Sequence, residues 1–321
     1  MGSIHARLYC QLEQSELVAI VDSDIEKAKK LAKKFKCRAS DTPDEIVPKV
    51  DAVTIATPTV THHDIALTFI DNGVSVLIEK PLAASVEQGQ RIVAAAESKG
   101  VVAAVGHSER CNPVVQAMKR LNIEAKFIEA HRISPYPFRS TDVGVVLDVM
   151  IHDIDIILSL ARSRIKKVDA VGVNVIDEKE DICNARIAFE NGCIANVTAS
   201  RLALKTERKV RVFSRQAYLS LDYLKKTGTV IKADPNIDVV EKIRQIKKTN
   251  AFDLLTMEWT GLLNIEKLDI NDDEPLRVEQ HSFLQAVADK TLRPEVTAEE
   301  GLAAMQCAEM ILESIKSHKW Q

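Results

Sequence analysis

The N-terminal part of the chain alternates short apolar runs with amphipathic stretches. Glu16–Val21, Asp51–Ala56 and Val74–Ile78 are apolar runs of strand length, and Asp24–Phe35 and Val86–Lys99 repeat apolar residues at helical spacing. A parallel strand that is covered on both faces is apolar throughout. The alternation therefore predicts an α/β domain with a doubly wound parallel sheet. The same pattern predicts further helices over 1–12, from 42 and over 62–72, and further strands at 37–39 and 101–105.

After Gly106 the pattern changes to strands that follow one another closely. A long helix is predicted over Asp142–Leu160, and Asn191-Gly192 separates two strand-like stretches, as is typical of a hairpin. This pattern predicts an α+β domain with an open antiparallel sheet that helices cover on one face. We expect a first domain over 1–107 and a second over 108–321. Strands are predicted at 126–133, 167–175, 182–189, 193–202, 209–213 and 218–223, edge strands and loops over 234–275, and closing helices over 279–288 and 298–318.

Composition limits the classes of protein that fit this pattern. The 321 residues are 46% hydrophobic and 28% charged, as in an ordinary soluble globular protein, and this length favours two domains. The formal net charge is −3, so the chain lacks the basic excess of a nucleic-acid-binding protein. No apolar run approaches the roughly 20 residues that span a bilayer. We expect no nucleic-acid or membrane partner.

The N-terminus and the cysteines indicate the compartment. Met1–His5 lacks the apolar segment of a secretory signal peptide, and the six cysteines include no Cys-x-x-Cys pair. Cysteines of this kind are typical of reduced thiols, and ligand-spaced pairs for zinc are absent from the sequence. We therefore expect a cytoplasmic protein without a bound metal.

The stretch Val74–Leu82 combines a buried strand with charged residues at its carboxyl end. Glu79 and Lys80 follow the strand, and Pro81 ends it because proline has no N–H to donate to a sheet. In open α/β sheets ligands bind at the carboxyl ends of the strands. The pair therefore predicts part of a ligand site, although an exposed Glu-Lys pair that ends a strand is an equal alternative from local features alone.

The chain lacks the opening of a dinucleotide-binding unit, which is a strand followed by G-x-G-x-x-G. Gly2 fits the third glycine, because Asp22 lies 20 positions after it at the end of a predicted strand. In that position Asp22 binds the ribose hydroxyls and disfavours a 2′-phosphate, which predicts NAD over NADP. The alternative for Asp22 is a turn or a helix cap. His5 and Arg7 on the first helix either lie near the pyrophosphate or are exposed.

The absent strand belongs in the middle of the sheet, between the strands at Val18–Val21 and Val53–Ala56. Its loss exposes main-chain groups on both neighbours, at about 1–3 kcal/mol for each buried unpaired group. We therefore expect the chain to be a shortened or mis-started version of a longer protein. If the shortened form is real, we expect impaired NAD binding.

An ordered set of short motifs resembles the glucose-fructose oxidoreductase, inositol dehydrogenase and rhizopine-catabolism (Gfo/Idh/MocA) family along essentially the whole chain. The resemblance implies a Rossmann domain followed by an open sheet, with Lys80 as a catalytic residue and a proline that often follows a cis bond. One departure is Cys111, where the family usually has phenylalanine. The matching residues are Ala56-Thr-Pro58, His62, Glu79-Lys-Pro-Leu-Ala83, Gly106-His107, Arg110, Asn112-Pro113, Asp148 and His152.

The family's aspartate and histidine on the long helix match Asp148 and His152. Residues four apart share one helical face, so both side chains are able to act on one substrate. Histidine accepts a hydroxyl proton near neutral pH, and an ammonium such as that of Lys80 stabilises the alkoxide. Without the resemblance, His152 is more simply a buried histidine of the core. The residues expected to bind NAD are Gly2, Asp22, Thr57, Pro58, His62, Glu79 and Lys80.

The segment 134–155 is similar to sugar-nucleotide dehydrogenases that oxidise C3 of UDP-N-acetylglucosamine. In this interpretation Arg110, Arg139 and Arg201 bind the substrate, because arginine forms paired hydrogen bonds with diphosphate; a salt bridge is an equal alternative for Arg139 and Arg201. A dehydrogenase of a free polyol such as inositol, and a non-catalytic NAD- or sugar-binding subunit, stay open as alternatives. The resemblance also implies a homodimer or homotetramer.

Overall fold

The computed structural model describes residues 1–136, 143–176, 178–215, 217–233 and 263–318. Contacts between residues divide the chain into two compact units, which we describe separately. Unit 1 contains Met1–Asn112, Ile154–Ile156 and Asp273–Glu313, and unit 2 contains Pro113–Asp153, Ile157–Asp272 and Ser314–Gln321.

Unit 1 confirms the predicted doubly wound parallel sheet. Every strand pair in it is parallel, and the strands alternate with helices along the chain. The strands are β1 (Ala19–Val21), β2 (Arg38–Ser40), β3 (Ala52–Ile55), β4 (Ser75–Glu79) and β5 (Ala103–Gly106), and the helices between them are α1 (Gly2–Tyr9), α2 (Ile25–Phe35), α3 (His62–Ile70) and α4 (Val86–Lys99).

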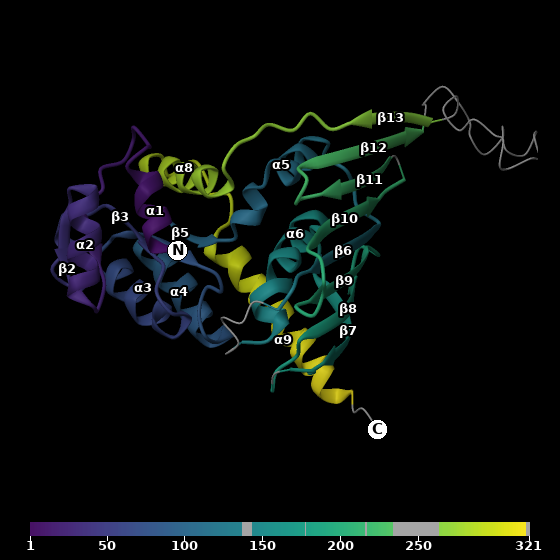
Figure 1. The fold of residues 1–321 in the computed structure, drawn as a ribbon, viewed down its shortest axis with the longest axis horizontal. Helices are drawn as coiled ribbons and strands as arrows, with labels where there is room; N and C mark the ends of the chain where they lie inside the picture. The colour runs from purple at the N-terminus through teal and green to yellow at the C-terminus, as the bar shows by residue number, and fades with distance from the viewer. Residues whose placement is uncertain (137–142, 177, 216, 234–262, 319–321) are drawn as a thin grey trace, which may run out of the picture. The chain divides into compact units, whose positions relative to one another are not determined.

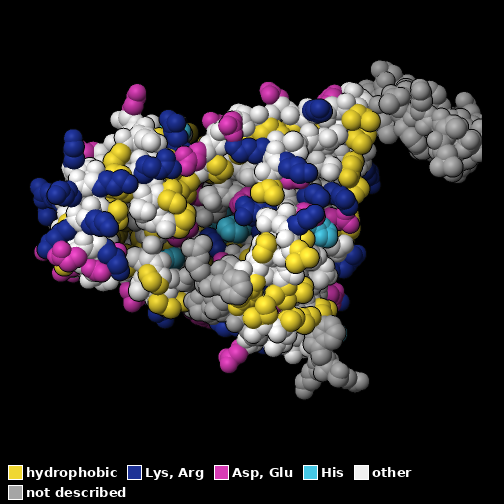
Figure 2. Space-filling view, in the orientation of Figure 1, with side chains coloured by type: hydrophobic (Ala, Val, Ile, Leu, Met, Phe, Trp, Pro, Cys, Tyr) yellow, Lys and Arg dark blue, Asp and Glu magenta, His cyan; other side chains and the backbone are white. Residues whose placement is uncertain are grey.

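Local chemistry explains where these helices begin and end. The side chain of Asp24 accepts hydrogen bonds from the main-chain N–H groups of Glu26 and Lys27, which caps α2 as predicted. Gly100 ends α4 in the left-handed conformation, with φ of 63°. The inner face of α2 buries alanines, and its lysines gather on the outside of unit 1 (Figure 2).

The parallel sheet of unit 1 is divided into two parts. One part has the order β1-β2 and the other has the order β3-β4-β5, with no hydrogen-bonded ladder between β1 and β3 in the described residues. The break between β1 and β3 lies at the position of the strand that the sequence analysis found to be absent. As a result, β1 and β3 each have a partner on one side only, and most of their residues are only half-buried.

The two closing helices belong mainly to unit 1, which differs from the predicted division at 107/108. They are α8 (Pro275–Ala288) and α9 (Ala298–Ser317), of which the part up to Glu313 lies in unit 1. Phe283 of α8 packs against Leu77 of β4 and Ala104 of β5 in one buried cluster. An amphipathic pattern shows that a helix buries one face, but it does not show which sheet that face covers.

Unit 2 contains one sheet of eight strands in the order β13-β12-β11-β10-β6-β9-β8-β7 (Figure 1). All neighbouring strands are antiparallel except β6 and β9, so the sheet is mixed rather than purely antiparallel as predicted. The parallel pair arises because α6 (Ile151–Ala161) crosses over between β6 and β7, and two hairpins then return the chain beside β6. The strands are β6 (Phe127–Ile133), β7 (Ile165–Val173), β8 (Ile182–Phe189), β9 (Ile194–Ser200), β10 (Glu207–Phe213), β11 (Ala217–Asp222), β12 (Thr227–Ala233) and β13 (Leu263–Lys267).

Several elements differ from the predictions in type or extent. The helix expected from Thr42 is only a short 3-10 turn at Val47–Lys49, and α5 (Pro113–Arg120) and β12 were not predicted. The predicted long helix begins with a π-helical turn at Val146–Met150 and continues as α6. The predicted hairpin at Asn191-Gly192 is present between β8 and β9, with Gly192 at a φ of 82°.

Candidate active site

The carboxyl ends of the strands in unit 1 carry the residues that the sequence marked as a ligand site. Asp22 follows β1, Thr57 and Pro58 follow β3, and Glu79 and Lys80 end β4. Because β3 and β4 are parallel neighbours in register, their carboxyl ends lie at the same edge of the sheet. The structure therefore brings together Thr57, Pro58, Glu79 and Lys80, as expected for a nucleotide site.

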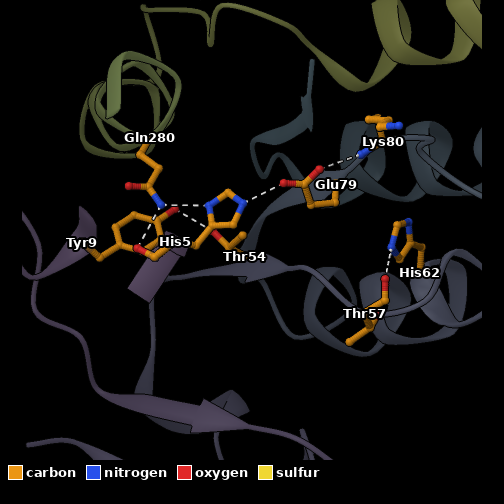
Figure 3. A network of polar contacts seen from close by, with 8 residues as sticks. All are labelled: His5, Tyr9, Thr54, Thr57, His62, Glu79, Lys80 and Gln280. Carbon is orange, nitrogen blue, oxygen red and sulfur yellow. Dashed lines mark hydrogen bonds and ion pairs between the residues drawn. The ribbon is translucent and has the colours of Figure 1, made fainter. Parts of the chain in front are cut away.

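Glu79 is held in place at both carboxylate oxygens (Figure 3). Its Oε1 lies 2.8 Å from Nε2 of His5, and its Oε2 accepts a hydrogen bond of 3.3 Å from the main-chain N–H of Lys80. The Lys80–Pro81 peptide bond is cis. These contacts fix the main chain at the point where Lys80 leaves the buried strand.

His5 lies inside unit 1 and not on an exposed face. It is 2% exposed, whereas Arg7 on the same helix forms a half-exposed salt bridge with Glu274. Gln280 of α8 lies beside His5, with its Nε2 at 2.9 Å from Nδ1 of the ring (Figure 3). Gln280 was not predicted as part of the site, because 275 residues separate it from His5.

Two buried ionisable groups lie close to Glu79. Burial, helped by the charges of Glu79 and Asp155, raises the pKa of Glu279 well above its ordinary value. Burial lowers the pKa of His107, which follows β5. Among the described residues the carboxylate oxygens of Glu279 have no hydrogen-bond partner. Burial therefore favours the uncharged form of both side chains at this edge.

His62 connects the two loops at the edge. It is 1% exposed, and its ring nitrogens each lie 2.9 Å from a main-chain carbonyl oxygen, that of Thr57 and that of Pro81. Both contacts are internal to the protein, so the geometry favours a structural role in which His62 holds the loops after β3 and β4 together. The predicted contact with the cofactor stays untested.

Asp22 lies at the end of the half-buried strand β1. Its Oδ1 accepts a hydrogen bond of 2.9 Å from the main-chain N–H of Asp24, which closes a turn. The turn that the sequence offered as an alternative is therefore present, and the contact of Asp22 with the ribose stays a prediction. The structure shows no close packing that requires glycine at position 2, where an added Cβ atom would meet nothing within 4 Å.

The second group of predicted residues lies in unit 2. Asp148 is in the π-helical turn and His152 is the second residue of α6, and both are half-buried. A π-helical turn within an α-helix is frequent at functional sites. Next to His152, Asp153 forms a buried ion pair with Arg132 of β6, with Nε at 2.8 Å from Oδ2. Joint action of Asp148 and His152 with Lys80, which belongs to unit 1, stays a prediction.

The arginines expected to bind substrate have internal partners. In unit 1 the Nε of Arg110 donates to Asp155 at 2.9 Å and its Nη1 donates to Glu300 at 3.1 Å. In unit 2 the Nε of Arg201 donates to Asp181 at 2.7 Å, and both side chains are fully buried. This geometry favours structural ion pairs at Arg110 and Arg201. Arg139 lies outside the described residues.

The edge of unit 1 has the features that a dinucleotide needs. The contact between His5 and Glu79 places the first turn of α1 at the carboxyl end of β4, and a helix N-terminus there attracts phosphate. Polar residues end β1, β3 and β4, and Lys80 supplies a cation. The residues present therefore fit NAD.

Two other kinds of feature are absent from the described part of the chain. There, no group of three or more His, Cys, Asp and Glu side chains is arranged to hold a metal ion. No helix in the described ranges is long and apolar enough to cross a membrane. None of the six cysteines is in a disulfide, and burial raises the pKa of Cys183 and of Cys307 to about 12, so these two thiols are protonated.

Two family models match this chain. The model of an oxidoreductase family with an NAD-binding Rossmann fold matches residues 1–107, and the model of the GFO/IDH/MocA C-terminal domain matches residues 122–220. The chain is 36% identical over 228 residues to a UDP-N-acetylglucosamine 3-dehydrogenase of Acidithiobacillus ferrooxidans, covering 71% of this chain and 72% of the relative. It is 29% identical over 221 residues to a scyllo-inositol 2-dehydrogenase (NAD(+)) of Bacillus subtilis, covering 63% and 64% of the two chains.

Solved structures agree with these matches. The structure of UDP-N-acetylglucosamine 3-dehydrogenase from Acidithiobacillus ferrooxidans has a TM-score of 0.86 and 29% identity, covering 98% of this chain and 94% of the other. Levoglucosan dehydrogenase in complex with NADH and levoglucosan has a TM-score of 0.81 and covers 100% of this chain and 96% of its own. At 19% identity that second likeness concerns the fold alone.

Proposed function

This chain belongs to the GFO/IDH/MocA family of NAD-binding oxidoreductases, and we propose that within this family it oxidises the C3 hydroxyl of UDP-N-acetylglucosamine. That it is an NAD-dependent dehydrogenase of a sugar or polyol follows from the family and from the names of its relatives. The finer assignment is carried by one observation, the 36% identity over 71% of the chain to an enzyme of that activity. The likeness in structure to the same enzyme supports it.

The proposed chemistry assigns one task to each of three side chains. Bound NAD supplies the acceptor for the hydride of the carbinol carbon. His152 accepts the hydroxyl proton at a ring nitrogen, and the Lys80 ammonium stabilises the negative charge that develops on the oxygen. Asp148 orients the imidazole, since a carboxylate beside a histidine fixes its tautomer and direction.

The remaining predicted contacts belong to binding. We propose that Asp22 binds the ribose hydroxyls of NAD and repels the additional phosphate of NADP. Gly2, Thr57, Pro58 and Glu79 contribute the surface around the cofactor. Of the arginines, we propose Arg139 as the partner of the diphosphate, because Arg110 and Arg201 already hold carboxylates inside the protein.

The assembly and the compartment are further parts of the proposal. We propose a homodimer or homotetramer that forms through the open sheet of unit 2, where Phe127, Phe213 and Tyr218 form an aromatic cluster with ring centroids 5.7 Å and 4.8 Å apart. Light scattering after gel filtration measures the mass. We also propose a cytoplasmic location.

One alternative has support of its own. The 29% identity to a scyllo-inositol 2-dehydrogenase favours a free polyol as the substrate. A polyol carries no diphosphate, so it would need no arginine partner. A non-catalytic subunit that binds NAD or a sugar is the second alternative, and it predicts binding of NAD without turnover.

An assay of NADH formation separates these functions. The chain is incubated with NAD and either UDP-N-acetylglucosamine or myo-inositol, and absorbance of NADH is followed. The sugar product is then reduced with borodeuteride, and mass spectrometry and NMR locate the deuterium. Deuterium at C3 supports the proposal, and deuterium at another carbon contradicts the assigned position. NADH formation from inositol alone favours the polyol dehydrogenase, and NAD binding without NADH formation favours the non-catalytic subunit.

A further inference from the structure

A chain of buried and partly buried hydrogen bonds in unit 1 runs from helix α8 to the main chain of Lys80 (Figure 3). The Nε2 atom of Gln280 contacts Nδ1 of His5 at 2.9 Å and the main-chain oxygen of His5 at 3.2 Å. On its other side the His5 ring contacts Glu79 at 2.8 Å. Gln280 is 0% exposed and the side chain of Glu79 is 12% exposed, so water competes little for these contacts.

The partners of His5 determine where its proton lies. A main-chain carbonyl oxygen only accepts hydrogen bonds, so the Gln280 atom that faces the oxygen of His5 must be the amide nitrogen. The same nitrogen faces Nδ1, so Nδ1 must carry a lone pair and accept. The single ring proton is therefore on Nε2, which donates it to Glu79. In this arrangement His5 accepts at Nδ1 from Gln280 and donates from Nε2 to Glu79.

Glu79 lies close to the main chain of Gly106 on its far side. A Cβ atom added to Gly106 would lie 3.2 Å from Oε2 and 3.2 Å from the Cα of Glu79, so a larger residue there would press on the carboxylate in its present orientation. Glu79 and Gly106 are paired in the register of β4 and β5. Burial and the charge of Glu79 raise the pKa of the neighbouring Glu279 carboxyl, which favours its protonated form beside Glu79.

We propose that His5 and Gln280 are positioning residues for Lys80: Gln280 fixes the tautomer of His5, His5 holds Glu79, and Glu79 fixes the main chain from which the Lys80 side chain extends. The kinetic part rests on the proposed function, in which Lys80 stabilises the alkoxide. The chain of contacts itself does not rest on the proposed function, because it concerns only the described atoms of unit 1. A C-terminal helix thereby sets the geometry of a residue on the fourth strand.

The first test compares variants of His5 in the full-length chain. His5→Phe removes the donor to Glu79 and should lower kcat about 10- to 100-fold, since a displacement near 1 Å has an effect of this size. His5→Gln places an amide donor close to the position of Nε2 and should restore kcat to within about threefold. The matched control is Tyr9→Phe, which removes a partly buried hydrogen bond of 2.6 Å to Thr54 from the same helix without touching Glu79. Thermal unfolding identifies variants that do not fold, and Gln280→Leu replaces His5→Phe if that variant fails.

A double-variant cycle shows whether the effect passes through Lys80. Combined with Lys80→Ala, His5→Phe should cause no further loss in single-turnover NADH formation, because the residue that it positions is gone. An additional loss equal to that in the wild-type background contradicts the proposal. Equal losses in His5→Gln and His5→Phe, or a comparable loss in Tyr9→Phe, also contradict it.

A second readout needs no enzymatic activity. The rate of reductive methylation of Lys80, measured by peptide mass spectrometry against Lys99, should change several-fold in His5→Phe and stay constant in Tyr9→Phe. Long-range proton–nitrogen NMR of histidine-labelled protein should show the proton of His5 on Nε2, and Gln280→Leu should release that preference. An unchanged methylation rate, or a proton on Nδ1, overturns the proposal even if the assigned substrate proves wrong. Absence of turnover in the wild type, with these two results as expected, contradicts only the proposed function.

Discussion

The two parts of the N-terminal sheet differ in how well they are buried. In β4, Val76, Leu77 and Ile78 are at most 1% exposed, and the strand has parallel partners on both sides. In β1 all three residues are half-buried, and the strand pairs with β2 alone. Glu79 and Lys80 follow the well-buried strand, whereas Asp22 follows the half-buried one. The proposed chemistry thus depends on the well-buried part of the sheet, and the proposed ribose binding depends on the part with an open edge.

This difference has a physical consequence for stability. A strand with one open edge leaves a row of N–H and C=O groups to solvent, and segments with few buried contacts open at lower free energy. The end of β4 is in addition held by α1 and α8 through His5 and Gln280. We therefore expect substitutions near β4 to have larger effects than equivalent substitutions near β1.

The largest expected effect is that of Lys80→Ala. Loss of the ammonium should lower turnover by about 10²–10³-fold, because it removes a charge that stabilises the developing alkoxide. The dissociation constant of NAD, measured by calorimetry, should stay within about threefold of the wild-type value if Lys80 acts mainly in the transition state. Lys99→Ala, at the exposed end of α4, is the control for loss of a lysine. Unchanged turnover in Lys80→Ala would remove the catalytic assignment.

A matched pair of core substitutions tests the difference in burial directly. Ile78→Ala in β4 removes a side chain that is 0% exposed, and it should lower the free energy of unfolding by about 2–5 kcal/mol. Ile20→Ala makes the same change in half-buried β1 and should lower the free energy of unfolding by about 1 kcal/mol, because less buried apolar area is lost. Denaturant unfolding of the two variants measures the difference. Equal losses would show that the open edge of β1 does not weaken its packing.

The next effect concerns the buried carboxyl of α8. Glu279 has a raised pKa because of burial and the charges of Glu79 and Asp155, so the folded protein holds a proton that the unfolded chain releases above the ordinary value of 4.5. Stability due to this group is complete below that value and falls as pH rises toward the raised pKa, by at most about 1.4 kcal/mol per pH unit. Glu279→Gln should remove this slope.

The pH dependence of unfolding in Glu279→Gln is compared with that in Glu274→Gln. Glu274 precedes the same helix and is half-exposed, so its replacement should leave the slope as in the wild type. If the slope of Glu279→Gln equals that of the wild type between pH 5 and pH 8, ionisation of Glu279 does not oppose folding.

The same contrast explains what the sequence was able to predict. Periodicity located the strands of unit 1, and the motif at Glu79 and Lys80 marked the edge where polar residues gather, because both depend on neighbours in the chain. The break between β1 and β3 was also expected, since each strand position in a doubly wound sheet follows from its order. These features could be predicted because they depend on neighbouring residues or on the order of the strands.

Contacts between distant segments were beyond the sequence. The burial of His5 depends on Gln280, and neither its spacing nor its type distinguishes Gln280 from an exposed glutamine. Arg110 and Arg201 were predicted to bind substrate from the family resemblance and from the paired hydrogen bonds that arginine forms, and the structure pairs them with Asp155 and Asp181 inside the two units. Which carboxylate pairs with which arginine depends on tertiary packing that one sequence does not encode locally.

The smallest expected effect belongs to Asp22, on the half-buried side of the comparison. Asp22→Asn keeps an oxygen that accepts from the N–H of Asp24, so the turn after β1 should survive while the negative charge is lost. We expect NAD to bind about tenfold more weakly and NADP to bind more tightly, because the hydrogen bonds of a charged oxygen are lost and repulsion of the 2′-phosphate ends. Asp24→Asn removes one negative charge from the same helix end and keeps the cap, so its ratio of NAD to NADP affinity should stay as in the wild type. If both variants change that ratio equally, general electrostatics at the start of α2 sets the cofactor preference, and Asp22 has no specific contact with the ribose.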